Sequence, residues 1–99
     1  MIRRVVIRPE AKQDLRDAKE WYQSITVELG AGFGRRFEEA LALVQEHPLA
    51  FRTVFRTFRR VLFHQFPYAI FYYAGKESIV VVAVLHQARD LELLRQRKT

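Results

Sequence analysis

The segment Phe66–Asp90 is the most strand-like part of this chain, and it constrains the fold more than any other feature. Aromatic and aliphatic residues occupy both alternating faces from Tyr68 to Tyr73, and Ile79–Leu85 contains no polar residue. The residues Ala74–Ser78 between them, which include a glycine, have the length and composition of a hairpin loop. The pattern predicts two antiparallel strands. Because Ile79–Leu85 is apolar on both faces, we expect a central strand that is covered twice, by helices on one side.

A strand and a long helix are predicted ahead of this pair. Arg3–Arg8 has the pattern of a short strand, and Pro9 follows where proline is best tolerated, in the first turn of a helix. An apolar stripe at steps of three and four residues predicts that this helix spans Glu10–Leu29. Trp21 lies beside the stripe, where packing between helices is favoured over a role as a binding platform.

Three glycines, Gly30, Gly32 and Gly34, are interpreted as the break between this helix and a second one. They do not have the spacing of a phosphate-binding loop. The second helix has its own apolar face and ends at His47-Pro48. Two such helices form an antiparallel hairpin, which can cover one face of a small sheet.

The remaining segments complete the predicted order. Leu49–Thr57 is interpreted as a connector, and Phe58–Phe63 as a strand that enters the sheet. After the last strand we expect a short C-terminal helix, with Asp90 as its N-cap and an ion pair between Arg89 and Asp90. The fold class is therefore α+β, in the order β-α-α-β-β-β with a short final helix. The sheet is twisted and mainly antiparallel, and residues 1–99 form one domain.

The charge distribution predicts one basic surface. The chain carries a net charge of +6, and eight of its eleven acidic residues lie between Glu10 and Glu46. No acidic residue occurs from His47 to Lys76. Such a surface suits nucleic acid, a machine bound to nucleic acid, or an acidic protein, although a solvated face without a ligand has the same pattern.

Several chemistries find little support in the sequence. There is no cysteine, which excludes disulfides and a cysteine nucleophile and fits a cytoplasmic location. The three histidines are far apart and accompany no carboxylate cluster, so we expect no metal or other cofactor. No apolar run is long enough to span a membrane.

One catalytic hypothesis has physical content, namely RNA cleavage by arginine, histidine and tyrosine side chains. A base would take the 2′-hydroxyl proton while cations stabilise the transition state. Structural roles compete with this interpretation, and a histidine at the end of a strand such as His86 is typically held by a hydrogen bond. The residues that could gather on the sheet are Arg59, Arg60, His64, Tyr68, Tyr72 and His86.

The order of elements and three segments resemble a known superfamily. The segments are HPLAFR at 47–52, RRVLFHQFPYAIFYY at 59–73 and VVVAVLHQARD at 80–90. They resemble the RelE/ParE superfamily of bacterial type II toxin–antitoxin toxins over nearly the whole chain. The resemblance implies a small cytoplasmic toxin that a cognate acidic antitoxin neutralises.

The superfamily contains ribosome-dependent mRNA endonucleases, which are RelE-like, and ParE-like toxins, some of which poison DNA gyrase. Endonucleases of this kind would carry arginines at the positions of Ala69 and Ala88 and a tyrosine at the position of Leu94. HQARD at the end of the last strand instead resembles the ParE-like branch, from which no catalytic residues are carried over.

We therefore expect a ParE-like toxin that acts by binding a target such as DNA gyrase. The alternatives are a RelE-like mRNA interferase, whose partners would be the ribosome and mRNA, and a non-toxic basic adaptor. The residues expected to contact the target or the antitoxin are Arg52, Arg56, Arg59, Arg60, His64, Tyr68, Tyr72, His86 and Arg89.

Overall fold

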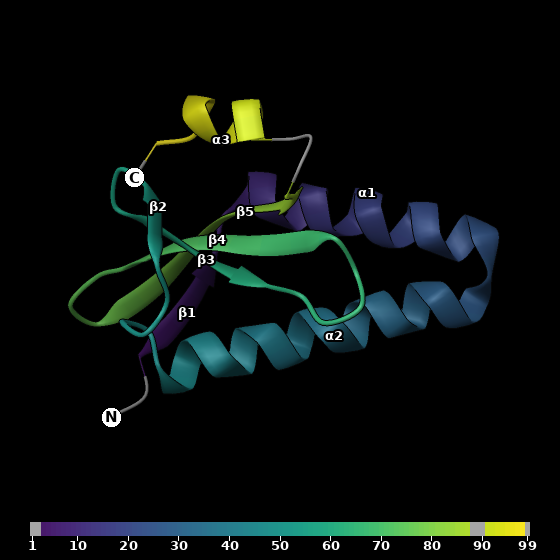
Figure 1. Ribbon diagram of the computed structural model, residues 1–99, viewed down its shortest axis with the longest axis horizontal. Helices are drawn as coiled ribbons and strands as arrows, with labels where there is room; N and C mark the ends of the chain where they lie inside the picture. The colour runs from purple at the N-terminus through teal and green to yellow at the C-terminus, as the bar shows by residue number, and fades with distance from the viewer. Residues whose placement is uncertain (1–2, 88–90, 99) are drawn as a thin grey trace.

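A computed structural model of the chain describes residues 3–87 and 91–98, which form one sheet with helices on both of its faces (Figure 1). The long helices α1 and α2 lie on one side of the sheet, and the short helix α3 lies on the other. The elements are, in chain order, β1 (Arg4–Ile7), α1 (Pro9–Ile25), α2 (Val27–Glu46), β2 (Thr53–Phe55), β3 (Phe58–Leu62), β4 (Tyr68–Ala74), β5 (Ser78–His86) and α3 (Leu91–Gln96).

The five strands are arranged in the order β1-β5-β4-β3-β2. β4 and β5 form the predicted antiparallel pair, in which Tyr68 lies opposite His86 and Ala74 lies opposite Ile79. On its other side β5 pairs with β1, and this pairing is the parallel one. The hairpin and the interior position of β5 are therefore confirmed, together with the α+β fold class.

The segment predicted as a connector contains a further strand. β2 pairs antiparallel with β3, and Phe55 lies opposite Phe58. The order is therefore β-α-α-β-β-β-β-α, with one strand more than the prediction. β2 has only three residues and lies between Arg52 and Arg56. Strands usually have five or six residues, so this pattern is too short to identify a strand from the sequence.

The helices meet at Thr26, and the predicted boundary at Gly30 was wrong. Thr26 has an extended backbone, its N–H donates to Tyr22 O, and its side-chain hydroxyl accepts from Leu29 N. One residue thus ends α1 and caps α2. The β-branched run Ile25-Thr26-Val27 disfavours helix at this point, which is a signal that the glycines obscured.

All three glycines lie inside α2. Gly30 is buried against α1, since a Cβ built there would lie 2.7 Å from the Cβ of Gln23. Because Gly30 has no side chain, α2 can pack closely against α1 there; the glycine does not form a turn. Trp21 is also placed differently from the prediction: its side chain is 59% exposed on the outer part of α1, although its ring contacts Tyr22 edge-on.

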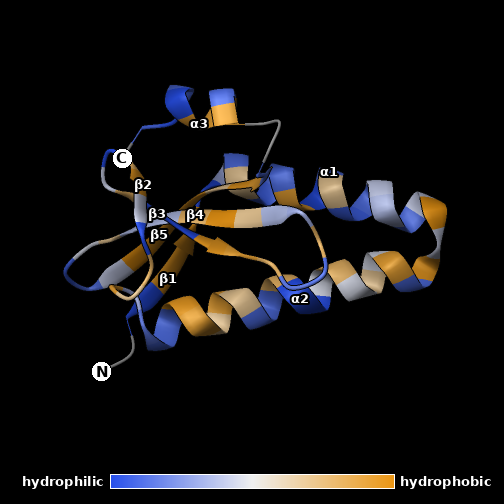
Figure 2. Ribbon diagram, in the orientation of Figure 1, coloured by the Kyte–Doolittle hydropathy of each residue, from blue (hydrophilic) through white to orange (hydrophobic). Residues whose placement is uncertain are grey.

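We call the side of the sheet that α1 and α2 cover the hairpin face. Its core is aromatic, and Phe33 of α2 lies at the centre with no exposed surface. The Phe33 ring lies 5.0–5.3 Å from four other rings, which belong to Tyr22, Phe63, Phe66 and Tyr68. In Figure 2, orange hydrophobic residues alternate with blue ones along the two helices and are frequent in the central strands.

We call the opposite side the α3 face. A β-bulge in β5 shapes it: Phe71 lies opposite Ala83 and Tyr72 opposite Val81, so that Val82 is the extra residue. Val82 and Ala83 therefore both point to the α3 face, and Val84 points to the hairpin face. Leu94 of α3 is buried over this surface, whose fully buried aromatic rings are Phe58 and Phe71.

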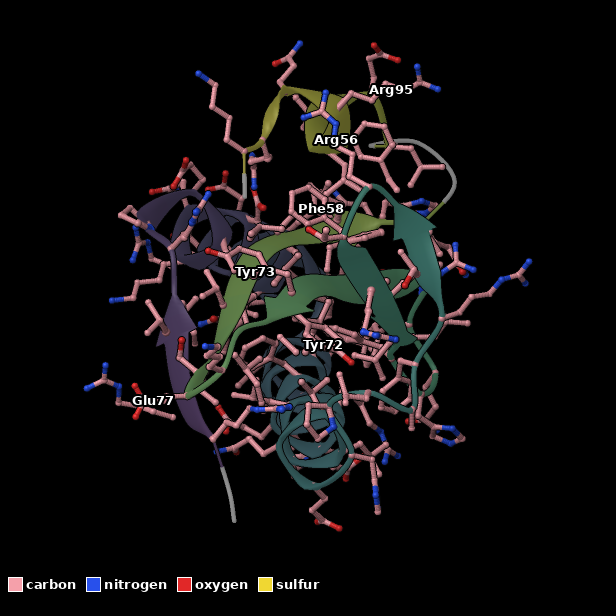
Figure 3. The ribbon with its side chains drawn as sticks, turned by 90° about the vertical axis from the view of Figure 1, so that its left-hand side faces the viewer. Arg56, Phe58, Tyr72, Tyr73, Glu77 and Arg95 are labelled. Carbon is pink, nitrogen blue, oxygen red and sulfur yellow. The ribbon has the colours of Figure 1, made fainter. Side chains whose placement is uncertain are left out.

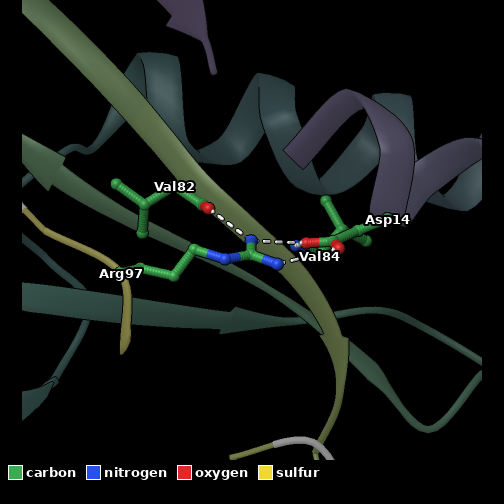
Figure 4. Close-up of polar contacts among 4 residues, drawn as sticks. All are labelled: Asp14, Val82, Val84 and Arg97. Atoms are coloured by element: carbon green, nitrogen blue, oxygen red, sulfur yellow. Dashed lines mark hydrogen bonds and ion pairs between the residues drawn. The ribbon is translucent and has the colours of Figure 1, made fainter. Parts of the chain in front are cut away.

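The C-terminal segment is held to the sheet by a group of polar contacts that we call the clasp, formed by Asp14 and Arg97 (Figure 4). The Arg97 guanidinium donates to both carboxylate oxygens of Asp14, at 2.8 and 3.1 Å, and to Val82 O at 2.8 Å. The Val84 N–H donates to Asp14 at 3.0 Å. The hydrogen bond that Arg97 donates to Asp14 raises the pKa of Arg97 against the opposing effect of burial.

The clasp stands where a neighbouring strand is missing. β1 pairs with β5 only as far as Ile7 beside Val81. Beyond that point the backbone groups of Val82 and Val84 would lack a partner on this side of β5, and the clasp satisfies them. The predicted contact between Arg89 and Asp90 lies outside the described residues.

Candidate binding surface

The predicted basic site is divided between the two faces of the sheet. Arg59 and Arg60 are adjacent in β3, so their side chains point to opposite sides. Arg59 points to the hairpin side, where its guanidinium donates to Leu49 O and Phe51 O at 3.3 and 2.7 Å. It fixes the segment that leads from α2 into β2, and its role there is structural.

Tyr72, another predicted site residue, belongs to the core of the hairpin face. Its side chain has no exposed surface, and its hydroxyl donates to Pro48 O at 2.8 Å. Burial raises the pKa of Tyr72, while the nearby charge of Arg59 acts in the opposite direction. A partner has no access to this side chain, because it is already used to attach the same segment that Arg59 holds. Figure 3 shows Tyr72 on the side of α2 and Tyr73 on the opposite side of β4.

Three arginines gather on the α3 face, at the margin formed by β2, β3 and α3. We call Arg56, Arg60 and Arg95 the arginine cluster. The guanidinium carbons of Arg56 and Arg95 lie 5.0 and 6.0 Å from the ring centre of Phe55, close enough for cation–π contact (Figure 3). Arg60 and Arg95 line a hollow of about 220 Å³ together with the apolar residues Val54, Phe55, Leu91 and Leu94.

The backbone at Arg56 has a positive φ of 53°, in the turn between β2 and β3. Glycine and asparagine are the usual residues for such a two-residue turn, and an arginine there costs about 1 kcal/mol or more. Among the described residues, Glu92 is the carboxylate that pairs with the cluster, at 3.8 Å from Arg95 and with both side chains well exposed. The cluster therefore presents an excess of positive charge beside an apolar hollow.

The other predicted residues lie elsewhere. Arg52 is exposed before β2, and its carbonyl accepts from the Arg60 N–H. Tyr68 and His86 face each other across β4 and β5, with their rings edge-on at 5.5 Å, beside the aromatic core. His64 is exposed in the turn after β3, and Arg89 lies outside the described residues. The structure thus brings Arg56 and Arg60 together and does not join them with Tyr68, Tyr72 or His86.

Arg95 and Phe55 were not predicted as site residues. Their signal is weak, because Arg95 belongs to a basic tail and Phe55 to the missed strand. The helical spacing of Leu91, Leu94 and Arg95 is the one hint that the tail would place an arginine beside the sheet. In residues 3–87 and 91–98, no three His, Cys, Asp or Glu side chains are grouped as a metal site would require, and no helix is long and apolar enough to cross a membrane.

Comparison with known proteins agrees with this fold. A family model described as ParE toxin of type II toxin–antitoxin system, parDE, matches residues 5–91. This chain therefore belongs to the ParE toxin family. A solved structure titled "Chromosomal ParDE TA system from P. aeruginosa" matches with a TM-score of 0.75 at 13% sequence identity. The match covers 86% of this chain and 96% of that one, and at this identity it concerns the fold alone. No curated protein sequence matches the chain.

Proposed function

We propose that this toxin arrests growth by binding a target such as DNA gyrase through the arginine cluster, and that a cognate acidic antitoxin neutralises it by covering the same surface. The observation that carries the proposal is the arginine cluster itself. Arg60 of β3 and Arg95 of α3 line one hollow, and Arg56 of the turn between β2 and β3 lies over the ring of Phe55, which lines the same hollow. Guanidinium groups beside apolar side chains recognise anionic, partly apolar surfaces.

The positions that would carry RNA-cleaving residues support binding over catalysis. Ala69 has no exposed surface and Leu94 is almost fully buried, and both pack in the core of the α3 face. Ala88 lies outside the described residues. The hydroxyl of Tyr72, which lies opposite Arg59 in the sheet, already donates a hydrogen bond to Pro48 O. An mRNA interferase remains the alternative that the experiment below distinguishes.

α3 already covers part of the sheet face on which we place the antitoxin. Phe58, Phe71 and Leu85 are buried on the α3 face. The apolar surface that stays accessible is at the margin, where Val54 and Leu91 are exposed beside Arg60 and Arg95. An acidic amphipathic helix would match this combination of charge and apolar area.

The test compares supercoiling by gyrase with primer extension on translated mRNA, using purified protein. We expect inhibition of supercoiling and no codon-dependent cuts. The double variant Arg56→Glu and Arg60→Glu should lose this inhibition by tenfold or more while keeping its melting temperature. The matched control is Lys19→Glu with Arg35→Glu, which changes the charge equally on exposed helix positions. Message cleavage with unaffected supercoiling, or equal loss in both double variants, would overturn the proposal.

A further inference from the structure

A large hollow lies on the hairpin side of the sheet, where β1 begins. After α2 ends, residues 47–52 lead the chain into β2. Within this segment Pro48 O accepts from the Tyr72 hydroxyl of β4 at 2.8 Å, and Leu49 O accepts from Arg59 of β3 at 3.3 Å. These bonds hold the segment over β3 and β4, which β5 separates from β1. A hollow of about 950 Å³ remains between the segment and the start of β1.

Cationic side chains form one side of this hollow. Arg3 and Arg4 stand at the start of β1, and Lys76 belongs to the loop between β4 and β5 (Figure 1). The Arg3 Nε donates to Lys76 O at 3.4 Å and the Arg4 N–H donates to Glu77 O at 3.1 Å, so the two segments are tied together. Val5 packs against the core of the hairpin face, and alternation along the strand places Arg3 on the same side. Three positive charges therefore gather at the β1 side of the hollow.

The opposite side of the hollow is apolar and fixed in place. It is formed by Pro48, Leu49 and Ala50, and the Leu49 side chain is 60% exposed. The two bonds from the sheet fix the carbonyls of this wall, and the Ala50 N–H donates to His47 O at 3.1 Å. A ligand therefore meets a preformed apolar surface, and little free energy is lost in ordering it on binding.

The acidic groups near the hollow show what kind of anion it can accept. Glu77 is the carboxylate among the described residues that line it, and it follows Lys76 in the loop. At the apolar side, His47 lies 3.9 Å from the Glu46 carboxylate. A ligand that is anionic along its whole length would thus meet a carboxylate at either side. The hollow suits a ligand with one anionic end and one neutral, largely apolar end.

We propose that this hollow binds a nucleoside polyphosphate, with its phosphates on Arg3, Arg4 and Lys76 and its base against Leu49. Guanidinium groups donate to phosphate oxygens in pairs and a lysine adds a point charge, so the three cations match two or more phosphates. Small-molecule sites have volumes of about 300–1,000 Å³, and this hollow is at the upper end of that range. A nucleic-acid strand fits less well, because its phosphates repeat and would pass both carboxylates. This inference is independent of whether the toxin acts on gyrase.

Calorimetric titration of the full chain with ADP, in buffer without divalent cations, tests the proposal. We expect saturable binding with a Kd below about 1 mM. Adenosine and pyrophosphate each offer one half of the contacts, so each should bind at least tenfold more weakly than ADP. High salt should weaken the binding of ADP and leave that of adenosine unchanged. A thymidine octanucleotide at the same concentration should not displace ADP.

NMR on the ¹⁵N-labelled chain locates the site. The amides of Arg3, Leu49 and Lys76 should shift when ADP is added, and those of the arginine cluster should not. Because this map uses the unaltered chain, it decides the location of binding whatever the stability of any variant.

Substitutions separate the two sides of the hollow. Arg3→Gln with Lys76→Gln should weaken ADP and pyrophosphate alike by tenfold or more. The matched control, Lys12→Gln with Lys19→Gln, removes two charges from exposed positions of α1 and should change neither. Leu49→Ala should weaken ADP by about threefold and leave pyrophosphate unchanged. Leu62→Ala in β3, where the side chain is also exposed, is the control for that change.

Four results would overturn the proposal. One is the absence of saturable ADP binding up to about 10 mM. Another is a set of shifts confined to the arginine cluster. A third is pyrophosphate binding as tight as that of ADP, or equal losses in the two double variants. The fourth is displacement of ADP by the octanucleotide, which would mean that the hollow binds a nucleic-acid backbone.

Discussion

The two faces of the sheet are closed in different ways. On the hairpin face, two long helices cover an apolar and aromatic core centred on Phe33, in which the hydroxyl of Tyr72 donates to Pro48 O. On the α3 face, a helix of six residues covers a smaller group, and it is held by the clasp of Asp14 and Arg97. We therefore expect the hairpin face to contribute more to the stability of the fold, whereas the α3 face has a smaller apolar cluster and depends also on a few directional polar contacts.

The largest effect should follow from a change in the hairpin face. Phe33→Ala removes the ring at the centre of four aromatic contacts, and we expect a loss of about 3–5 kcal/mol in the free energy of unfolding. Urea denaturation measures it, with Phe58→Ala as the equivalent change on the α3 face. If Phe58→Ala proves the more damaging, the two faces contribute in the reverse order.

A smaller loss should follow when the clasp is broken. Asp14→Asn leaves Arg97 without its anion at a site where both side chains are only about one-seventh exposed, 14% and 13%. We expect a cost of about 1–3 kcal/mol. Amides of α3 should then exchange faster while those of α1 and α2 stay protected.

Asp17→Asn is the control for the clasp, since Asp17 lies on the same helix and is exposed. Its stability should stay within about 0.5 kcal/mol of the original. Uniform acceleration of exchange over the whole chain in Asp14→Asn would mean that the clasp supports both faces.

Tyr72 gives a test of pH dependence on the hairpin side. Its pKa is raised above 10.0 by burial, so the folded state favours the neutral phenol. As the pH rises past about 10, the unfolded chain ionises first and stability falls until the folded pKa is passed. Tyr72→Phe should cost about 1 kcal/mol at neutral pH through the bond to Pro48 O.

That cost should shrink above pH 10, because the phenylalanine variant lacks this ionisation. Denaturation at neutral and alkaline pH measures the difference, and Tyr73→Phe on the other face of β4 is the control. A constant difference across this range would contradict the assignment of the alkaline loss to Tyr72.

The smallest effect concerns the packing of the helices themselves. Gly32→Ala adds a methyl group at ordinary contact distance, 3.7 Å from Arg35 and 3.9 Å from Phe66, and should stabilise α2 by about 0.5–1 kcal/mol. Gly30→Ala should destabilise the fold, because the same methyl group would meet Gln23 at 2.7 Å. Thermal melts of both variants distinguish a glycine that packs from one that does not.

Much of the fold was predictable because apolar patterns report it directly. The run Ile79–Leu85 placed β5 in the interior, and the spacing of Phe33, Phe37 and Val44 identified the inner side of α2. The bulge at Val82 was not predictable, since a continuous apolar run hides which residues share a face. The break at Thr26 was missed because glycines compete with it as a signal.

The binding surface was predicted less well, for a physical reason. Consecutive residues of a strand face opposite ways, so Arg59 and Arg60 could not both belong to one patch once β3 was formed. Arg95 lies near Arg60 only because the chain is folded. Asp14 and Arg97 form an ion pair although 83 positions separate them in the sequence. Contacts between distant segments leave no local pattern, which is why the sequence pointed to a basic surface and not to its members.

The pairing of β1 with β5 also sets the order in which a newly made chain can be completed. The first strand leaves the ribosome long before its partner, and the two helices, whose contacts are local, can fold in the interval. The sheet can close only after residue 86 has emerged, and the clasp can close only later, when Arg97 has followed. Until α3 has emerged, the surface beneath it is therefore open, and the arginine cluster lacks Arg95.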